Sequence, residues 1–349
     1  MNPHLISLFV VLPMLAGIIT LFLSRWRPAQ RLGFVFLLAN VGLAVRTLSA
    51  LYIDESVAGH ILVSQMGNWP APFGITIAVD LLAGIMLTVA SIVALAVFVY
   101  CINQLDEDHE TSLFHPLFHF LIFGVQWSFI TGDLFNLFVA FEIMLMASYA
   151  MFVIGSSRAQ MRQAYKYILI NLLGSTLFVT CAGLIYGHLG TLNMADITRL
   201  AMTDQLPPRC IPVIGLLLVV FGGKTAIFPL WYWLPESYPT LPAPIGGLFA
   251  GLLTKVGAYV LIRVFVMMFG TSQAVVDMLA PIVLVSAIVT MFVGVLGAVS
   301  MHSVRSILSI HIISQVGYMV MGIALGMGAV AGLSPEQVDL KILAVAGAI

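Results

Sequence analysis

Lys224 lies inside an apolar stretch that glycines precede and prolines follow, Phe221-Gly-Gly-Lys-Thr-Ala-Ile-Phe-Pro229. A lysine at the centre of a membrane-spanning helix costs about 2.5–3.5 kcal/mol on insertion scales, so such a residue indicates a functional site. Pro229 has no backbone N–H to donate, and broken backbone at membrane depth is tolerated only where it faces protein or a water-filled cavity. The stretch therefore predicts a discontinuous helix with a proton- or ion-handling lysine at its break.

A second charged residue at predicted membrane depth is Glu142, near the middle of the apolar run 134–154. A carboxyl group alone at that depth stays protonated, because burial disfavours the charged form, whereas one beside a lysine can ionise. We hypothesise that Glu142 and Lys224 come from different helices and form a buried pair, whose formation and rupture change the lysine's affinity for its proton. The alternative is a static pair that only fixes helix packing.

Lys255 is the next candidate, in the apolar run 245–269. A buried lysine can relay protons near neutral pH where a solvated lysine cannot. Tyr259 and Arg263 follow at four-residue steps and are predicted to share its helical face. The competing interpretation has Lys255 reach the membrane interface from a helix placed one turn differently.

A polar stripe is predicted in the run 307–331, where His311, Ser314, Gln315 and Tyr318 follow one another at helical spacing. Histidine titrates near neutral pH, so the stripe suits a proton wire with ordered water. The same residues could instead hold neighbouring helices together by hydrogen bonds.

Four other polar residues are expected to be structural. Asn171 and Ser175, at positions i and i+4 of the run 165–186, favour helix packing. His115 and His119 lie close to the start of a predicted helix and are expected at the membrane interface.

The elements that position these residues are membrane spans. The 349 residues are 61% hydrophobic and 8% charged, and apolar runs long enough to cross a hydrocarbon core of about 30 Å recur along the chain. We predict spans near 3–23, 32–52, 79–102, 114–130, 134–154, 165–186, 211–233, 245–269, 275–299 and 307–331, and an eleventh that begins at Leu340. A short amphipathic segment is expected at 194–203. The sequence stops inside the eleventh span, about ten residues after Leu340, so we interpret the chain as the N-terminal part of a longer protein.

Orientation follows from the basic residues. Loops after the first, fifth and ninth spans contain half of the 14 lysines and arginines: Arg25, Arg27, Arg31, Arg158, Arg162, Lys166 and Arg305. The opposite loops contain only Arg199 and Arg209. The positive-inside rule then predicts that the N-terminus lies outside.

Several classes of function are disfavoured. The net charge of −1 indicates no nucleic-acid partner. Three scattered cysteines form neither a metal site nor a disulfide framework. The chain contains no glycine-rich phosphate loop, no iron–sulfur spacing and no dinucleotide fingerprint, so we expect no cofactor, no metal and no soluble active site. Any redox or nucleotide-driven step is expected to belong to a partner subunit.

The motifs around these charged residues resemble those of the antiporter-like superfamily of proton-translocating membrane subunits. The resemblance covers the whole chain and rests on the Glu142 helix, the Gly-Gly-Lys224-Thr-Ala-Ile-Phe-Pro stretch, Lys255 and the helix from 304 to Tyr318. The superfamily includes membrane subunits of respiratory complex I and of Mrp-type multisubunit cation/proton antiporters. The sequences Asp133-Leu-Phe-Asn-Leu-Phe-Val and Leu-Met-Ala-Ser-Tyr149 are most similar to the D-type component of Mrp antiporters.

The resemblance implies an all-α polytopic fold with inverted five-helix repeats, each of which contains a broken helix. It implies three parts: N-terminal helices at 1–112, a first five-helix unit at 113–270 with its break near Lys224, and the start of a second unit at 271–349. It also implies that Glu142 and Lys224 form the modulating pair and that Lys255 passes protons onward. A charged residue on a second broken helix, beyond Ile349, would complete the path.

We therefore predict a subunit of a hetero-oligomeric sodium/proton antiporter in the bacterial inner (plasma) membrane, with K⁺ or Li⁺ as alternative cations. Protons would move through Glu142, Lys224, Lys255 and His311 and drive cation extrusion, with no enzymatic reaction. Its partners would be the other subunits, protons, the cation and the lipid bilayer. The first alternative is a proton-pumping subunit of a complex I-like oxidoreductase or membrane-bound hydrogenase. The second is a structural subunit that transports nothing.

Overall fold

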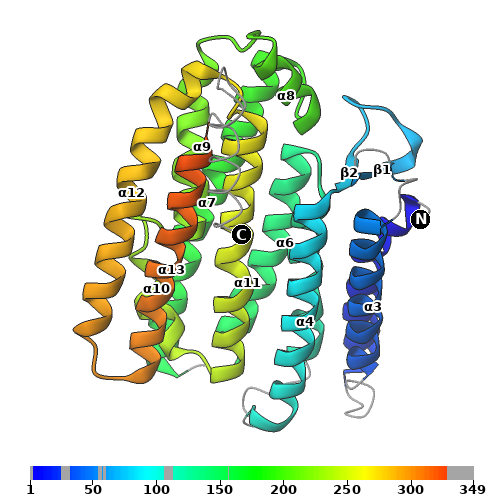
Figure 1. Cartoon of the computed structure of the whole chain (residues 1–349). Helices are drawn as coiled ribbons and strands as arrows, with labels where there is room; N and C mark the ends of the chain where they lie inside the picture. Colours follow the sequence, from blue (N-terminus) through cyan, green and yellow to red (C-terminus); the bar gives the residue numbers. More distant parts are fainter. Residues whose placement is uncertain are drawn as a thin grey trace. The chain divides into compact units, whose positions relative to one another are not determined.

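The structure, a computed structural model, describes residues 3–24, 32–53, 57, 60–105, 113–155 and 157–327 (Figure 1). The chain divides into two compact units. The first comprises Met1–Tyr165 and Leu241–Leu252, and the second comprises Lys166–Thr240 and Leu253–Ile349. The predicted parts 1–112, 113–270 and 271–349 are a different kind of division, based on repeats, and they stay a prediction.

The first unit consists of apolar helices and one small hairpin. It contains η1 (Pro3–Ser7), α1 (Leu8–Phe22), α3 (Leu32–Ile53), α4 (Leu81–Gln104), α5 (Phe114–Ile130) and α6 (Leu134–Val153). Strands β1 (Leu62–Gln65) and β2 (Thr76–Val79) pair antiparallel, with Leu62 opposite Val79, and η3 (Met66–Asn68) follows β1. This hairpin was not predicted, because four-residue strands are too short to show a clear alternating pattern.

Two aspartates begin helices of the first unit. The Asp80 carboxylate accepts the backbone N–H of Ala83 at the start of α4, and Asp133 accepts that of Asn136 at the start of α6. Each carboxylate satisfies a backbone donor that the first helical turn cannot satisfy itself. The tight turn between α5 and α6 therefore lies at 131–133, where the sequence predicted a boundary between two spans.

Buried polar side chains link α3, α4 and α5. Asn40 donates to Gln126 at 2.9 Å, and Gln126 donates to Ser91 at 3.1 Å. His119 is fully buried and His115 is 4% exposed, so both imidazoles pack inside the first unit, and the expectation that they lie at the level of the membrane interface stays a prediction. A Cβ atom at Gly33 would lie 2.2 Å from His119 Nε2, so a glycine on α3 makes room for the imidazole. Hydropathy alone could not show this packing.

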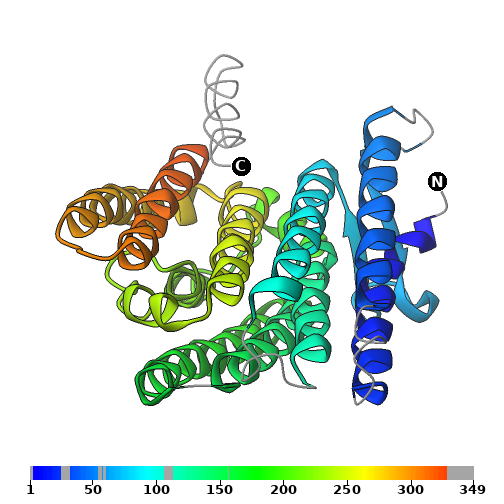
Figure 2. The same ribbon diagram turned by 90° about the horizontal axis from the view of Figure 1, so that it is seen from below.

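The second unit contains most of the long helix α7 (Arg158–Leu189), the amphipathic α8 (Met194–Met202) and α9 (Cys210–Thr225). The short α10 (Trp233–Ser237) and η4 (Tyr238–Thr240) lead to α11 (Ala243–Leu261), whose residues up to Leu252 belong to the first unit, and α11 continues as the π-helical η5 (Ile262–Met268). The last described helices are α12 (Gln273–Val299) and α13 (Val304–Gly326). Figures 1 and 2 show α12 and α13 side by side.

All ten predicted spans that fall on described residues coincide with apolar helices. Eight of the described helices are long and apolar enough to cross a membrane, and α5 and α9 are shorter apolar helices. The chain is thus a multi-pass membrane protein with an almost entirely helical fold. The largest differences from the predicted boundaries are in α7, which begins at Arg158, and in α9, which ends at Thr225 instead of continuing to 233. The predicted eleventh helix at Leu340 lies outside the described residues.

Candidate functional site

A helix end is present one residue after Lys224. Helix α9 ends at Thr225, and Ala226 adopts a left-handed conformation with φ 65°. The N–H of Ile227 bonds the Gly222 carbonyl at 3.0 Å, and that of Ala226 bonds the Gly223 carbonyl at 3.3 Å. This pair of bonds is the Schellman pattern, which closes a helix by satisfying its last carbonyl groups. Lys224 therefore lies in the last helical turn, where the helix dipole favours a cation.

Side chains of α10 and α12 bond backbone groups on the two sides of the break. Trp233 Nε1 on α10 donates to the Gly223 carbonyl at 2.9 Å. The Phe228 N–H donates to Thr290 Oγ1 of α12 at 2.8 Å. Pro229 lies in the exposed turn after Ala226 and has no N–H that would need a partner. The backbone that the break releases is thus bonded by protein groups, as an interrupted membrane helix requires.

Lys224 is buried, with 6% of its surface exposed, and its Nζ donates to Ser175 Oγ at 3.3 Å. Ser175 is itself buried on α7, and the rings of Phe178 and Phe221 pack edge-to-face between α7 and α9. We had assigned Ser175 to helix packing. The polar spacing of Asn171 and Ser175 on an apolar helix was the only sequence signal that could have found this contact. Asn171 bonds the Tyr167 carbonyl within its own helix.

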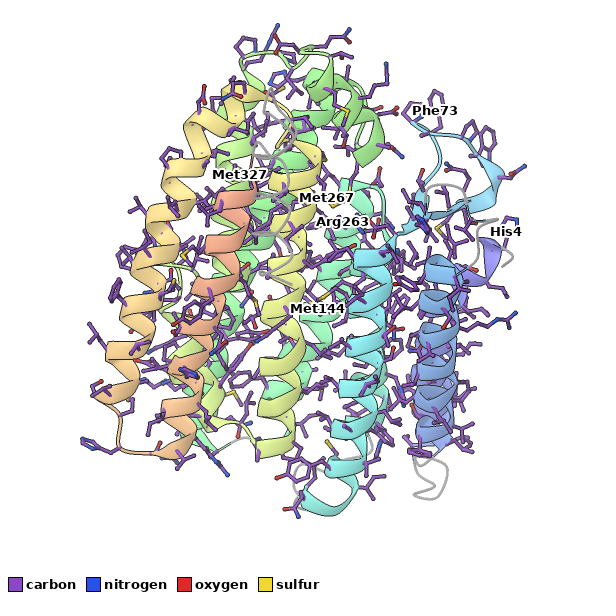
Figure 3. All side chains as sticks on the ribbon, viewed as in Figure 1. His4, Phe73, Met144, Arg263, Met267 and Met327 are labelled. Atoms are coloured by element: carbon purple, nitrogen blue, oxygen red, sulfur yellow. The ribbon has the colours of Figure 1, made fainter. Side chains whose placement is uncertain are left out.

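Helix α11 carries the second lysine. Lys255 is half-buried, and its Nζ donates to Thr254 Oγ1 at 3.4 Å. One turn on, Arg263 Nε donates to the Tyr259 hydroxyl at 2.7 Å, and the guanidinium lies 5.0 Å from the Tyr259 ring centroid. Arg263 also contacts the Met267 sulfur at 3.4 Å (Figure 3). Tyr259 and Arg263 are thus joined, as the four-residue spacing predicted, at the point where α11 becomes π-helical.

Glu142 lies on α6 in the first unit and is half-buried. Its Oε1 atom is buried and has no hydrogen-bond partner among the residues that the structure describes. A buried carboxyl oxygen without a partner is costly, so this atom calls for a proton, a water molecule or a cationic group. The pairing of Glu142 with Lys224, which belongs to the second unit, stays a prediction.

The polar residues of α13 do not all face the same way. The Gln315 side-chain amide contacts His311 Nε2 at 3.2 Å, and both residues are exposed, as is Tyr318. Ser314 is fully buried, and a Cβ atom at Gly294 of α12 would lie 2.4 Å from the Ser314 nitrogen. The structure therefore groups His311, Gln315 and Tyr318 and separates Ser314 from them.

Other residues of the second unit, which we had not placed in the site, support the break. Gly257 of α11 touches it, because a Cβ atom there would lie 2.6 Å from Thr225 Oγ1. Beyond the break, Lys166 Nζ bonds Glu236 at 2.5 Å and lies 5.4 Å from the Tyr232 ring centroid. No group of three or more His, Cys, Asp or Glu side chains that could hold a metal ion occurs among the described residues.

Comparisons with known proteins agree on one family. The family model described as NADH:quinone oxidoreductase/Mrp antiporter, TM matches residues 131–334, a range that contains Glu142, Lys224, Lys255 and His311. The D-type component of the Na(+)/H(+) antiporter of Alkalihalophilus pseudofirmus is 42% identical over 325 residues, and that of Bacillus subtilis is 36% identical over 322 residues. Each alignment covers 92% of this chain and 64% of the relative, so the chain spans somewhat less than two thirds of these proteins.

Solved structures give the same result for the fold. A chain in the Mrp complex from Dietzia sp. DQ12-45-1b matches with a TM-score of 0.85 and 29% identity, over 98% of this chain and 61% of that chain. A chain of an archaeal membrane-bound sulfane sulfur reductase has the same fold, with a TM-score of 0.85 and 24% identity, over 97% of this chain and 67% of that chain. Since the family model covers more than half of its residues, this chain belongs to the NADH:quinone oxidoreductase/Mrp antiporter membrane family.

Proposed function

We propose that the chain is the D-type membrane component of a multisubunit Na⁺/H⁺ antiporter and that Lys224 carries protons through it. The observation that carries this proposal is the burial of Lys224 in the last turn of an interrupted helix, with its Nζ 3.3 Å from Ser175 Oγ. Ionisable residues at such positions are expensive to maintain and mark ion pathways. The names of the two bacterial relatives support the choice of a sodium/proton antiporter.

The chemistry of the site suits proton exchange. A hydroxyl group can accept a hydrogen bond from a charged lysine and donate one to a neutral lysine, so Ser175 is compatible with both forms of Lys224. A buried amine near a carboxylate changes its proton affinity when that carboxylate moves or is neutralised. We assign this modulating role to Glu142, and we assign onward transfer to Lys255 and then to His311. The path would be supported by four polar side chains, Tyr259, Ser314, Gln315 and Tyr318. Pro229 would maintain the helix break beside the path, because it has no backbone N–H with which to continue the helix.

The remaining assignments follow from this function. Na⁺ is the proposed cation, with K⁺ or Li⁺ as alternatives, and no covalent reaction takes place. The partners are the other subunits of the complex and the surrounding lipid. We place the protein in the bacterial plasma membrane with its N-terminus outside, because one set of loops contains half of the basic residues. A protease site fused before Met1 should then be cut in spheroplasts but not in everted vesicles.

The repeat boundaries belong to the same proposal. Within 113–270 the described apolar helices are α5, α6, α7, α9 and α11, which supports a five-helix unit there. Helix α12 would then begin the second unit.

The test uses everted membrane vesicles from a host without its own antiporters, which express the complete gene with its neighbouring subunit genes. A pH-sensitive dye reports the collapse of an imposed proton gradient when Na⁺ is added. We expect Lys224→Ala to abolish this response at unchanged abundance of the complex. The matched control is Arg199→Ala, which removes an exposed positive charge from α8 and should transport normally.

Two results would overturn the proposal. If Lys224→Ala responds to Na⁺ as the wild type does, the lysine is not on the proton path. If the assembled wild-type complex shows no response to any alkali cation, a redox-driven proton pump becomes the better interpretation, and quinone reduction would be measured next.

A further inference from the structure

The backbone at the break forms a hydrogen bond with helix α12, which is distant from it in the sequence. After the Schellman pattern at Ala226 and Ile227, the next backbone donor is the Phe228 N–H, and its acceptor is Thr290 Oγ1 on α12, 62 positions further along the chain. Both residues belong to the second unit. A backbone donor at membrane depth must find an acceptor, because no bulk water is available to it. Thr290 therefore holds the break at one defined place.

The geometry of the Thr290 hydroxyl makes this contact directional. Thr290 is fully buried, and its Oγ1 also donates a hydrogen bond to the Ser286 carbonyl of its own helix. A hydroxyl has one hydrogen and two lone pairs. Because the hydrogen is used within α12, a lone pair faces the Phe228 N–H. The hydroxyl thus joins the α12 backbone to the break in a single chain of hydrogen bonds.

Helix α12 is in turn packed directly on α13. A Cβ atom at Gly294, one turn after Thr290, would lie 2.4 Å from the Ser314 nitrogen, and one at Gly317 of α13 would lie 2.7 Å from the Met291 nitrogen. Such close backbone approach through glycines is typical of tightly associated membrane helices. A displacement at Phe228 therefore acts on α12 and α13 together.

We infer that Thr290 is a positioning residue that couples the state of the broken helix at Lys224 to the α12–α13 pair. This inference rests on the proposed function. Lys224 lies four residues before Phe228, so a movement of the last turn of α9 reaches the Phe228 N–H through the short segment between them. A movement of Lys224 on proton gain or loss is then transmitted to α12 through the hydrogen bond between Phe228 and Thr290. In the other direction, a rearrangement of α12 and α13 moves the break. The Thr290 hydroxyl thus links the protonation state of Lys224 to the arrangement of α12 and α13.

The test compares three variants of the complete complex. Thr290→Val keeps the shape of the side chain and removes the acceptor, whereas Thr290→Ser keeps the hydroxyl. Thr20→Val is the matched control, because Thr20 is equally buried and its hydroxyl bonds carbonyl groups of its own helix α1. If Thr290→Val prevents assembly, Thr290→Ala takes its place with the same expected results.

The first readout is hydrogen–deuterium exchange of peptides that contain Phe228, which reports the anchoring without any transport. Loss of one hydrogen bond should speed exchange of this amide about fivefold to tenfold in Thr290→Val. Thr290→Ser and Thr20→Val should match the wild type.

The second readout is Na⁺-dependent collapse of the proton gradient over a range of pH. Thr290→Val should lower it about tenfold and displace its pH optimum, and Thr290→Ser should restore both.

Unchanged exchange at Phe228 in Thr290→Val would overturn the anchoring. Faster exchange with normal transport would overturn the coupling. A wild-type complex that exchanges no Na⁺ for protons would instead refute the proposed function, and the deuterium data would still decide whether Thr290 anchors the break.

Discussion

Replacement of Gly257 by alanine tests how closely α11 must approach the break. The new Cβ atom would lie 2.6 Å from Thr225 Oγ1, 3.1 Å from its backbone nitrogen and 3.2 Å from its Cα. The first distance is about 0.8 Å shorter than the 3.4 Å at which ordinary contact begins. The hydroxyl cannot turn away cheaply, because Thr225 is fully buried and Oγ1 bonds the Phe221 carbonyl at 2.6 Å. Either α11 or the end of α9 must therefore move.

The expected cost of this overpacking is about 1–3 kcal/mol. Alanine also gains up to about 1 kcal/mol over glycine as a helix former, which would hide part of the effect. Gly247→Ala on the same helix controls for this gain, because a Cβ atom at Gly247 meets nothing within 4 Å. The difference between the two variants isolates the clash with Thr225.

The assay is the apparent melting temperature of the purified complex in detergent, followed by transport in everted vesicles. We expect Gly257→Ala to melt a few degrees below Gly247→Ala. It should also transport more slowly, because Thr225 adjoins Lys224. Equal melting temperatures and equal transport in the two variants would show that the break tolerates a shifted α11, and the reasoning from close approach would fail.

Two further substitutions test other parts of the second unit. Ala226→Gly should stabilise the complex by up to about 1 kcal/mol, because glycine adopts the left-handed conformation at φ 65° without the steric cost that alanine bears. A lower melting temperature for this variant would contradict the left-handed conformation. Gly294→Ala should destabilise α12 against α13 by about 1–3 kcal/mol, since its Cβ atom would meet backbone of α13 at 2.4 Å. Gly297→Ala is the comparison, because its new atom would meet the Ile310 side chain at 3.0 Å instead of backbone at 2.4 Å, so it should lower the melting temperature less than Gly294→Ala does.

The membrane spans and the end of helix α9 beside Lys224 could be predicted from the sequence, whereas the role of Lys224 in transport stays a prediction. Each depends on local properties: the length of an apolar run, the residues that end a helix and the cost of a charge within that run. The amphipathic α8 and the turn between α5 and α6 were predictable for the same reason. The resemblance to known motifs added the family, which the comparisons support.

The partners of these residues were decided only by the tertiary structure. Ser175 contacts Lys224 across 49 positions, and Thr290 contacts Phe228 across 62. Such contacts depend on the rotation and register of each helix against its neighbours, and hydropathy contains neither. The burial of His119 against Gly33 and the separation of Ser314 from His311 have the same origin. The sequence by itself determined which residues are expensive to place in a membrane, and the packing of the helices determined which neighbours stabilise them.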